Sequence, residues 1–198
     1  MERTRIAIVI PAFNEAKTIK SIINKCLKYG TVIVVDDGSQ DNTVKKVLET
    51  HAILIKNKTN LGYDKSLNAG FKKALVLKKK YVITLDADNQ HDPKNLKKFI
   101  KYLDDGYEVV IGKRPYYSRF SEKIYGKITN NLFGFSDPLC GMKGYNILVY
   151  RKLGQFDNLN SVGTQLTIYA AKRKLSIKEI DININERFDN SRFGGSLN

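Results

Sequence analysis

The stretch IAIVIPAFNE, from Ile6 to Glu15, opens with five consecutive apolar residues, which end at Pro11 and lead into a polar segment. An apolar run of this kind, rich in β-branched residues, is typical of a strand buried on both faces of a sheet. Apolar residues at helical spacing follow from Ile19 to Leu27 and stop before Gly30. The stretch therefore predicts a buried strand that passes through a polar turn into an amphipathic helix.

The same alternation continues through the first half of the chain. In chain order, the further expected elements are strand 32–35, helix 43–50, strand 52–55, helix 67–75, strand 81–85 and helix 96–103. Asp92 and Pro93 are suited to begin the last of these helices as N-cap and first residue. Strands and helices in this order form parallel strands joined by crossovers on both faces. We therefore predict an α/β fold with an open, mostly parallel sheet of the nucleotide-binding kind.

Composition limits the class of protein. The chain has 198 residues, of which 42% are apolar, and its formal net charge is +14. A chain of this length and apolar content forms one domain with a sizeable core. No apolar run approaches the roughly 18 to 20 residues of a membrane span, and Met1 to Arg5 does not begin a signal peptide, so we expect a protein that is soluble and not secreted. Cys26 and Cys140 lie in no metal-ligand spacing and predict buried thiols in a reducing compartment.

The excess of positive charge points to an anionic partner. Nucleic acid, an anionic membrane surface and a phosphorylated substrate all fit a charge of +14, and composition alone does not choose among them.

Three polar clusters follow three of the expected strands. They are PAFNE (11–15), DDGSQDNT (36–43) and DADNQHD (86–92). Ligands of an open α/β sheet bind at the carboxyl ends of its strands, where these clusters would converge. Each cluster alone also fits turn and helix-cap chemistry, including the part of Asp36, Gly38 and Asn42. Their coincidence at one edge favours a binding site.

The pair Asp86 and Asp88 is the most informative part of these clusters. Two carboxylates one residue apart at a strand end, in a cation-rich chain, predict an oxygen-ligand site for Mg²⁺ or Mn²⁺. Such an ion neutralises charge on a diphosphate leaving group. Gln90 could add a carbonyl or water contact, whereas His91 beside Asp92 is interpreted as a loop residue satisfied by the backbone rather than as a ligand or base.

Five ordered motifs together resemble one family. PAFNE, VVDDGSQDNT, NLGYDKSLNAG (60–70), LDADNQHDP (85–93) and IGKR (111–114) stand in the order and spacing of family 2 glycosyltransferases with the GT-A fold. The Asp-x-Asp-x-Gln-His signature is most similar to dolichol-phosphate mannose synthases and related polyprenyl-phosphate hexosyltransferases. The resemblance covers nearly the whole chain. It implies one catalytic domain over 1–198, with a nucleotide-binding half (1–112) and an acceptor-binding half (113–198).

The resemblance also implies roles for single residues on the donor side. Asp88 and Gln90, with Asp86, would bind the divalent metal that carries the donor diphosphate. Asp37 would hydrogen-bond the base or the ribose. The expected nucleotide-sugar residues are Pro11, Phe13, Glu15, Asp37, Asp86 and Ala87.

Three residues are expected at the reacting groups. Arg114 matches the basic residue that would face the acceptor phosphate or the donor. Asp137, in SDPLCGMKGY (136–145), would lie beside the reacting sugar. Arg187 matches the late arginine at the acceptor phosphate, with Arg192 as competitor because the motif that normally follows is blurred here.

The departures from the family pattern concern the sugar and the acceptor, and leave metal and nucleotide binding almost intact. Asp64 could repel or hydrogen-bond a sugar, and at Gln165 a carboxylate expected near the sugar is missing. The departing positions are Tyr63, Asp64, Lys113, Met142, Lys143 and Gln165.

The implied partners are a nucleotide-diphosphate sugar of the GDP-mannose or UDP-glucose type and a polyprenyl phosphate. A lipid monophosphate is already anionic and nucleophilic, so the protein must mainly align two phosphates, and we predict direct displacement with inversion. Cations and aromatics interleave over the stretch 113–127 and favour contact with an anionic membrane over a merely solvated basic face. We expect a cytoplasmic protein, peripheral at the inner face of the membrane.

Three other functions fit parts of the sequence. A nucleic-acid-binding protein would explain the charge but not three acidic clusters at strand ends, so no nucleic-acid partner is expected. A nucleotidyltransferase would open with a Gly-rich basic loop, which PAFNE lacks. The main alternative is a family 2 transferase that acts on a soluble or polysaccharide hydroxyl, which would need a general base, and Asp137 is the one good candidate.

Overall fold

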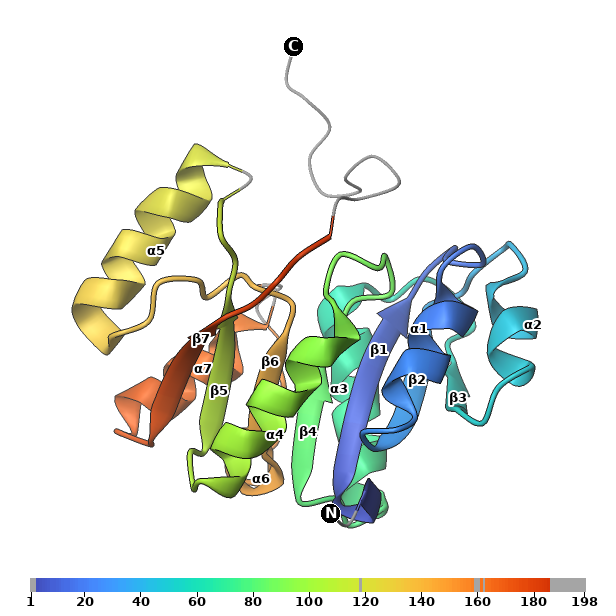
Figure 1. The fold of residues 1–198 in the computed structure, drawn as a ribbon, viewed down its shortest axis with the longest axis horizontal. Helices are drawn as coiled ribbons and strands as arrows, with labels where there is room; N and C mark the ends of the chain where they lie inside the picture. The colour runs from blue at the N-terminus through green and yellow to red at the C-terminus, as the bar shows by residue number, and fades with distance from the viewer. Residues whose placement is uncertain (1–2, 118, 159–160, 162, 186–198) are drawn as a thin grey trace.

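The structure, a computed structural model, describes residues 3–117, 119–158, 161 and 163–185. These residues form one sheet in the order β3-β2-β1-β4-β6-β5-β7 with helices around it (Figure 1). The strands are β1 (Ile6–Ala12), β2 (Thr31–Asp36), β3 (Ile53–Lys56), β4 (Tyr81–Thr84), β5 (Val109–Lys113), β6 (Lys143–Asn146) and β7 (Ile177–Asp181). The α-helices are α1 (Ile19–Cys26), α2 (Thr43–Leu48), α3 (Tyr63–Val76), α4 (Leu96–Asp104), α5 (Phe120–Phe133), α6 (Ile147–Leu153) and α7 (Thr164–Lys172), and the 3-10 helices are η1 (Arg3–Arg5) and η2 (Pro93–Asn95).

The predicted mostly parallel sheet is confirmed. β1 pairs in parallel with β2 and β4, β2 with β3, and β5 with β7. β6 is the exception, because it runs antiparallel between β4 and β5. Its sequence, KGYN, holds no apolar run, so the usual strand pattern does not reveal it.

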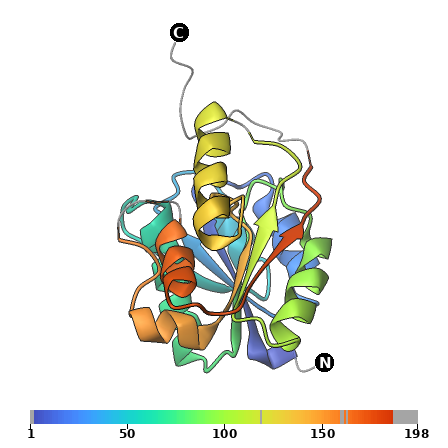
Figure 2. The same cartoon turned by 90° about the vertical axis from the view of Figure 1, so that its left-hand side faces the viewer.

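Two apolar layers fill the space between the sheet and its helices. In β1, Ile6, Ile8 and Ile10 belong to the layer that includes α1 and α4, while Ala7 and Val9 belong to the layer that includes α3, α6 and α7. Figure 2 shows the sheet nearly edge-on with helices on both sides. Burial on both faces explains why the strand sequence is apolar without alternation. Cys26 and Cys140 are both free and buried, as predicted.

Pro11 does not end the first strand, contrary to the sequence-based expectation. β1 continues to Ala12 and pairs with β2 as far as Asp36. On its other side, the pairing of β1 with β4 stops at Val9 and Thr84. Pro11 therefore lies beyond the end of one neighbour, where its missing N–H costs the ladder nothing.

α3 lies close against β1 because residue 70 is glycine. A Cβ at Gly70 would lie 2.2 Å from Val9 Cγ1. The close packing holds the first turn of α3, which carries Tyr63 and Asp64, next to the carboxyl ends of β1 and β4.

α5 stands apart from the rest of the helices, beside the upper end of β5 in Figure 1. Within this helix only Gly126 and Thr129 are buried. A Cβ at Gly126 would lie 2.2 Å from the Ser136 carbonyl oxygen, so the helix contacts the protein through small residues. Phe133, at the end of the helix, also packs against the core, whereas Phe120, Ile124, Ile128 and Leu132 are exposed. Among the described residues, every helix is too short or too polar to cross a membrane.

Candidate active site

The three polar clusters meet at the carboxyl edge of the sheet. The first cluster is bonded to the second, because Asn14 N donates to Ser39 Oγ at 2.9 Å and Gln40 N donates to Asn14 Oδ1 at 2.8 Å. It is also tied to the third, because Thr18 Oγ1 donates to the Ala87 carbonyl oxygen at 2.6 Å. The parallel order of β2, β1 and β4 thus brings together residues that lie far apart in the sequence.

Asp37 organises the loop that leads into α3. It is buried, and its Oδ1 accepts hydrogen bonds from Asn57 Nδ2 at 2.8 Å and Leu61 N at 2.9 Å. Its Oδ2 accepts a hydrogen bond from Gly62 N at 2.8 Å. Both oxygens of Asp37 therefore have protein partners. Its contact with the base or the ribose stays a prediction.

Asp36 is a candidate for which the sequence left turn chemistry and a part in the binding site both open. The residue is 0% exposed, and its Oδ2 accepts a hydrogen bond from Ser39 N at 3.3 Å. Its Oδ1 is buried and has no hydrogen-bond partner among the described residues. A buried carboxylate oxygen without a donor is costly, so this atom is suited to accept a hydrogen bond from a ligand. Its place as the last residue of β2 was the available signal.

Asp86 accepts a hydrogen bond from one side chain, and the ring of His91 lies near its other oxygen without a hydrogen bond. Tyr63 Oη donates to Asp86 Oδ1 at 2.9 Å, and His91 Nδ1 lies 3.5 Å from Asp86 Oδ2. Burial and the neighbouring charge of Asp86 raise the pKa of the Tyr63 hydroxyl well above its ordinary value, so Tyr63 acts as a hydrogen-bond donor. Gly141 leaves the necessary room, because a Cβ there would lie 2.1 Å from Asp86 Oδ2.

His91 differs from its sequence interpretation as a loop residue satisfied by the backbone. The side chain is buried, and its Nε2 lies 3.9 Å from Cys140 Sγ. The ring therefore lies between Asp86 and Cys140. The contacts of Tyr63 and His91 with Asp86 are ones that sequence spacing did not reveal.

Asp88 and Gln90 follow Asp86 in a tight turn. Gln90 N donates to Asp88 Oδ1 at 3.0 Å, and Asn89 between them has a φ of 65°. In the part of the chain that the structure describes, no three His, Cys, Asp or Glu side chains form a metal-binding group by themselves. The half-buried Asp88 beside Asp86 still fits a hard divalent cation whose other ligands come from a diphosphate, because the protein then needs to supply only one or two carboxylate oxygens.

Arg114 and Asp137 form a buried ion pair at the end of β5. Arg114 Nε and Nη2 donate to the two carboxylate oxygens of Asp137, each at 2.8 Å, and Arg114 Nη2 also lies 3.1 Å from Glu122 Oε2. Burial alone would lower the pKa of the Arg114 guanidinium, but the hydrogen bonds and charge of Asp137 hold it above its ordinary value. Glu179 of β7 completes the cluster, because its Oε1 accepts from Asp137 N at 2.8 Å.

A family model described as "Glycosyl transferase family 2" matches residues 7–181. The chain belongs to glycosyltransferase family 2. This glycosyltransferase is 31% identical over 211 residues to the UDP-N-acetylglucosamine--dolichyl-phosphate N-acetylglucosaminyltransferase of Methanococcus voltae, which covers 89% of this chain and 84% of that protein. It is 32% identical over 161 residues to the undecaprenyl-phosphate 4-deoxy-4-formamido-L-arabinose transferase of Proteus mirabilis, which covers 71% of this chain and 48% of the relative.

The fold of the glycosyltransferase is also found in solved structures. A crystal structure of glucosyl-3-phosphoglycerate synthase from Mycobacterium tuberculosis, in complex with Mn²⁺, UDP-glucose and phosphoglyceric acid, matches with a TM-score of 0.77 at 22% sequence identity. The match covers 94% of this chain and 72% of that chain. The expected GT-A fold is therefore confirmed.

Lys143, a departure of this glycosyltransferase from the family pattern, is fully enclosed. Its side chain is 2% exposed, and Nζ donates to the Gly163 carbonyl oxygen at 3.1 Å. Burial lowers the pKa of the ammonium group to about 8, although the charges of nearby acidic groups, including Asp137 and Asp64, partly oppose this shift. Two departures from the family pattern, Asp64 and Lys143, thus interact across the start of α3.

Gln165 stands where the family pattern of the glycosyltransferase has a carboxylate near the sugar. Gln165 Oε1 accepts from Asn158 N at 2.7 Å, and Gln165 N donates to Asp157 Oδ2 at 3.2 Å. Asp157 is itself buried and also accepts from Ser161 Oγ. The segment before α7 is therefore arranged around a carboxylate at position 157.

The remaining predicted residues have different placements. Pro11 and Ala87 are buried at the strand ends, Phe13 and Glu15 are half-buried in the first cluster, and Glu15 Oε2 accepts from Thr18 Oγ1 at 3.0 Å. Arg187 and its competitor Arg192 lie outside the described residues, so their predicted contacts with an acceptor phosphate stay predictions.

Proposed function

We propose that this enzyme transfers a hexose, with inversion, from a nucleotide-diphosphate sugar to a polyprenyl phosphate of the dolichyl type at a membrane surface. The names of the relatives from Methanococcus voltae and Proteus mirabilis, which specify dolichyl phosphate and undecaprenyl phosphate, support this acceptor class. The proposal treats residues 1–112 as the nucleotide-binding half and residues 113–198 as the acceptor-binding half.

The state of Asp137 is the observation that carries the proposal. Transfer to a hydroxyl needs a general base, and Asp137 was the one good candidate from the sequence. Its side chain is 1% exposed, and both oxygens are bound by the Arg114 guanidinium. A carboxylate held this way offers no free oxygen to an acceptor hydroxyl while the ion pair is intact. A lipid phosphate needs no such base, since it reaches the site as an anion.

The donor half fits a nucleoside diphosphate with a divalent ion. Asp88, Gln90 and Asp86 would hold Mg²⁺ or Mn²⁺, which when bound offsets the charge that develops on the diphosphate leaving group. The hydrogen bond from Tyr63 would orient Asp86, with the ring of His91 near its other oxygen. Asp36 Oδ1 would accept a hydrogen bond from the nucleoside, with the segment Pro11 to Glu15 covering it.

The acceptor half fits a second anionic group. Arg114 is held by Asp137 and Glu122 at the end of β5 and keeps its positive charge at any physiological pH. In that position it would attract the acceptor phosphate toward the donor and orient its attack on the anomeric carbon. Arg187 would contribute a second cation there.

The outer surface of α5 supports action at a membrane. Four apolar side chains recur at intervals of four residues, which places them on one side of the helix. They are Phe120, Ile124, Ile128 and Leu132, exposed to 76%, 46%, 49% and 66%. We call these four residues the α5 stripe. Exposed basic residues flank the α5 stripe at 119, 123 and 127. An apolar stripe beside cations suits the interface of an anionic bilayer, as expected at the cytoplasmic, inner face of a cell membrane.

The experiment that tests the proposal is a donor panel. The purified enzyme is incubated with polyprenyl phosphate, Mg²⁺ or Mn²⁺, and UDP- or GDP-linked hexoses and N-acetylhexosamines, and the released nucleoside diphosphate is measured. We expect release from one nucleotide class that depends on the lipid phosphate, and a product of opposite anomeric configuration to the donor. A product that keeps the donor configuration, or release only with a hydroxyl acceptor, would contradict the proposal.

A further inference from the structure

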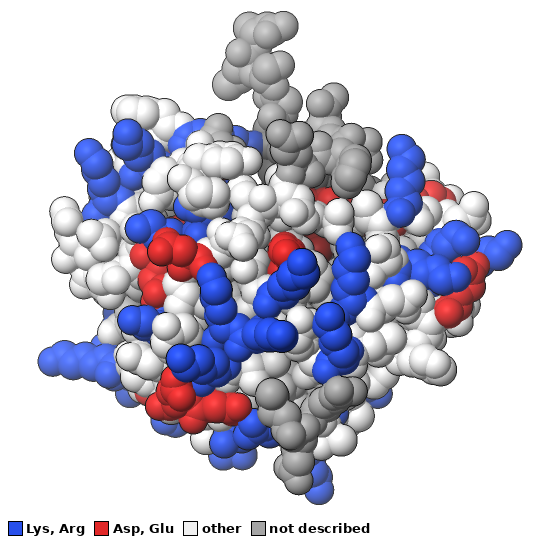
Figure 3. Space-filling view, in the orientation of Figure 1, with Lys and Arg blue, Asp and Glu red and all other residues white. Residues whose placement is uncertain are grey.

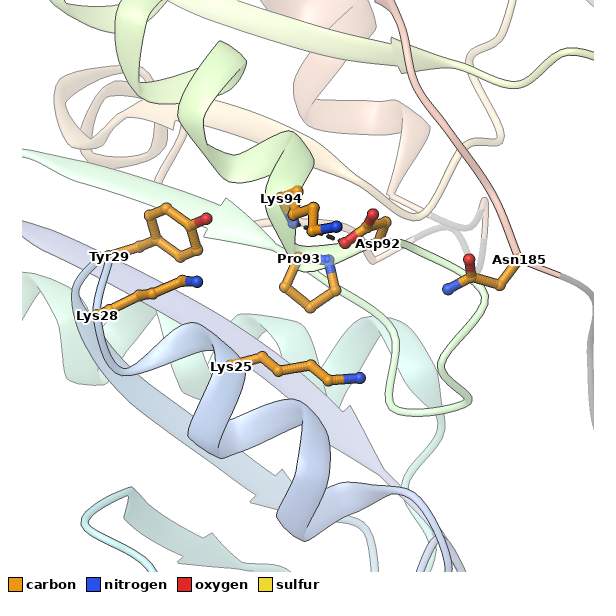
Figure 4. A pocket seen from close by; sticks show the side chains of 7 residues that line it. All are labelled: Lys25, Lys28, Tyr29, Asp92, Pro93, Lys94 and Asn185. Carbon is orange, nitrogen blue, oxygen red and sulfur yellow. Dashed lines mark hydrogen bonds between the residues drawn. The ribbon is translucent and has the colours of Figure 1, made fainter.

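A pocket of about 300 Å³ lies on the face that carries α1 and α4 (Figure 4). It lies between the carboxyl-terminal end of α1, with the turn that follows, and the start of η2. The residues that line it are Lys25, Lys28, Tyr29, Asp92, Pro93, Lys94 and Asn185. None of them is among the residues predicted to bind the donor or the acceptor.

The charge of this pocket is positive. The residues that line it include three ammonium groups, from Lys25, Lys28 and Lys94, and one carboxylate, from Asp92. Asp92 Oδ1 is occupied, because it accepts a hydrogen bond from Lys94 N at 2.9 Å at the start of η2. Figure 3 shows that Lys and Arg side chains are abundant on this face of the molecule. The pocket therefore favours an anion.

Tyr29 adds an independent indication of a ligand. The residue is 8% exposed, and its hydroxyl is buried with no hydrogen-bond partner among the described residues. In Figure 4 the hydroxyl points toward Pro93 and Lys94, which also line the pocket. A buried hydroxyl without a partner destabilises the folded state, and an acceptor in the pocket would supply the missing hydrogen bond. The Lys28 ammonium group lies over the Tyr29 ring, 5.2 Å from its centroid, so a cation stands close to this side chain.

We propose that this pocket is a second anion site that binds a phosphate group. A phosphate oxygen would accept the Tyr29 hydroxyl proton in a hydrogen bond, while Lys28, Lys94 and Lys25 neutralise the charge. The volume exceeds that of a free phosphate ion and admits a phosphoester with a small organic group. The same chemistry is present in soluble phosphoesters and in the headgroup of phosphatidylglycerol.

The pocket is joined to the acidic turn of the candidate active site. Asn185, on the pocket wall, donates from its backbone N to the Gln90 carbonyl oxygen at 2.7 Å and from Nδ2 to the Asn89 carbonyl oxygen at 3.0 Å. Asp92 lies two residues beyond Gln90 in the same segment. A ligand in the pocket would thus act, through Asn185, on the turn that carries Asp88. The inference does not depend on which acceptor the enzyme uses.

The test is a titration followed by backbone amide NMR without divalent metal. Inorganic phosphate and glycerol 3-phosphate are the soluble probes. We expect saturable shifts at Tyr29, Lys94 and Asn185 that are weakened about tenfold by Tyr29→Phe and at least tenfold by the double variant Lys28→Gln/Lys94→Gln. The matched control, Lys72→Gln/Lys97→Gln, removes the same charge from exposed positions outside the pocket and should leave the affinity unchanged.

A second arm measures binding to phosphatidylglycerol vesicles with the same variants. Pocket-dependent binding of the soluble probes assigns the site to a soluble phosphoester, and pocket-dependent binding of vesicles alone assigns it to a lipid headgroup. The proposal is overturned if phosphate shifts only residues 86–90, or if the pocket variants and the matched control behave alike in both arms. Tyr29→Phe keeps the ring and its packing, so its result stands even if the double variant folds poorly.

Discussion

Arg114 and Asp137 join the end of β5 to the segment that precedes β6. The Arg114 guanidinium binds both oxygens of Asp137 at 2.8 Å, and the Arg114 backbone N–H adds a third hydrogen bond at 2.9 Å. Asp137 is the more deeply buried partner, at 1% exposed, and the side chain of Arg114 is 16% exposed. The pair therefore fixes one cation at the edge where the acceptor is expected, and both oxygens of the carboxylate are engaged by that cation.

Asp137→Asn tests this relationship. The change keeps the side-chain shape but leaves the Arg114 charge without its main partner, so we expect a loss of about 3 kcal/mol in the free energy of unfolding and a large fall in kcat. Urea unfolding and steady-state turnover measure the two effects. Arg114→Lys is the companion variant, because it keeps a positive charge and loses the two-pronged contact. If Asp137→Asn retained wild-type stability and turnover, the pair would have neither role.

Gly141→Ala tests the packing of the acidic pair. The new methyl group would lie 2.1 Å from Asp86 Oδ2, so Asp86 must move away from Tyr63 and His91. We expect a rise in KM for the nucleotide sugar of at least tenfold and a loss of stability of about 1 to 3 kcal/mol. Gly106→Ala is the control, because its φ of 98° strains the backbone at a place with no atom within 4 Å of the added Cβ. Equal effects of both variants on KM would contradict the assigned role.

Asp88→Ala tests the metal assignment. In the wild type, Mg²⁺ or Mn²⁺ should enhance the binding of UDP or GDP, because Asp88 is proposed to supply a carboxylate oxygen to the ion. In the variant we expect this enhancement to be lost, so that the affinity for the nucleotide in the presence of metal falls at least tenfold. Isothermal titration with and without EDTA measures this enhancement. Asp105→Ala removes an exposed carboxylate at the end of α4 and should keep it. Metal-dependent binding that survives in Asp88→Ala would contradict the assignment.

Lys143 predicts a pH dependence of stability. Burial lowers the pKa of its ammonium group from 10.5 to about 8. Between these values the unfolded chain holds a proton that the folded chain has released, so this group makes the folded state more stable as pH rises from about 8 to 10.5. The expected gain is of the order of a few kcal/mol.

Lys143→Met should remove this gain. Cys26 and Cys140 act in the opposite sense above pH 9, because burial raises the pKa of each thiol to about 12. Both thiols are present in both proteins, but the charge of Lys143 lowers the pKa of Cys140, so the difference in unfolding free energy between wild type and variant reports Lys143 together with its interaction with Cys140. A difference that stays constant from pH 7.5 to 10.5 would show that the lysine does not titrate in this range.

The α5 stripe predicts membrane binding that separates from catalysis. Phe120→Ser/Leu132→Ser should weaken binding to phosphatidylglycerol vesicles at least tenfold, because each side chain contributes about 1.5 to 3 kcal/mol when fully buried in the bilayer. Turnover with a short, water-soluble prenyl phosphate should change little. The control Leu48→Ser/Val76→Ser removes two apolar side chains of similar exposure, 68% and 73%, from α2 and α3. Vesicle binding that falls equally in both double variants would refute the role of the α5 stripe.

Much of the fold could be predicted from the sequence because two signals mark the strands in the first half of the chain, an apolar run and the polar cluster that follows it. Ile6 to Ile10 and Val32 to Val35 are apolar runs that burial on both faces requires, and each ends at a polar cluster. β6 escaped prediction because its position between β4 and β5 is set by tertiary pairing rather than by its own sequence, KGYN. Pro11 was misinterpreted as a strand end, since the sequence does not show that β4 stops two residues earlier.

The candidate site was predicted where residues are adjacent in sequence and missed where the fold brings them together. The spacing of Asp86 and Asp88 is visible in the chain, whereas the contacts of Asp86 with Tyr63 and His91 depend on how α3 and the following turn pack. The ion pair of Arg114 with Asp137 spans 23 residues and carries no local pattern. Such contacts become visible only when the register of the sheet is known.

The most direct test of the central claim compares two acceptors of identical chain length, a polyprenyl phosphate and the corresponding polyprenol, with the donor that the panel selects. Labelled sugar transferred to the lipid is measured under the same metal and detergent conditions. We predict labelled polyprenyl-phosphate sugar and no transfer above background to the alcohol, because in the proposed reaction the nucleophile is already anionic and Asp137 is engaged by Arg114. Transfer to the alcohol at a comparable rate would contradict this account.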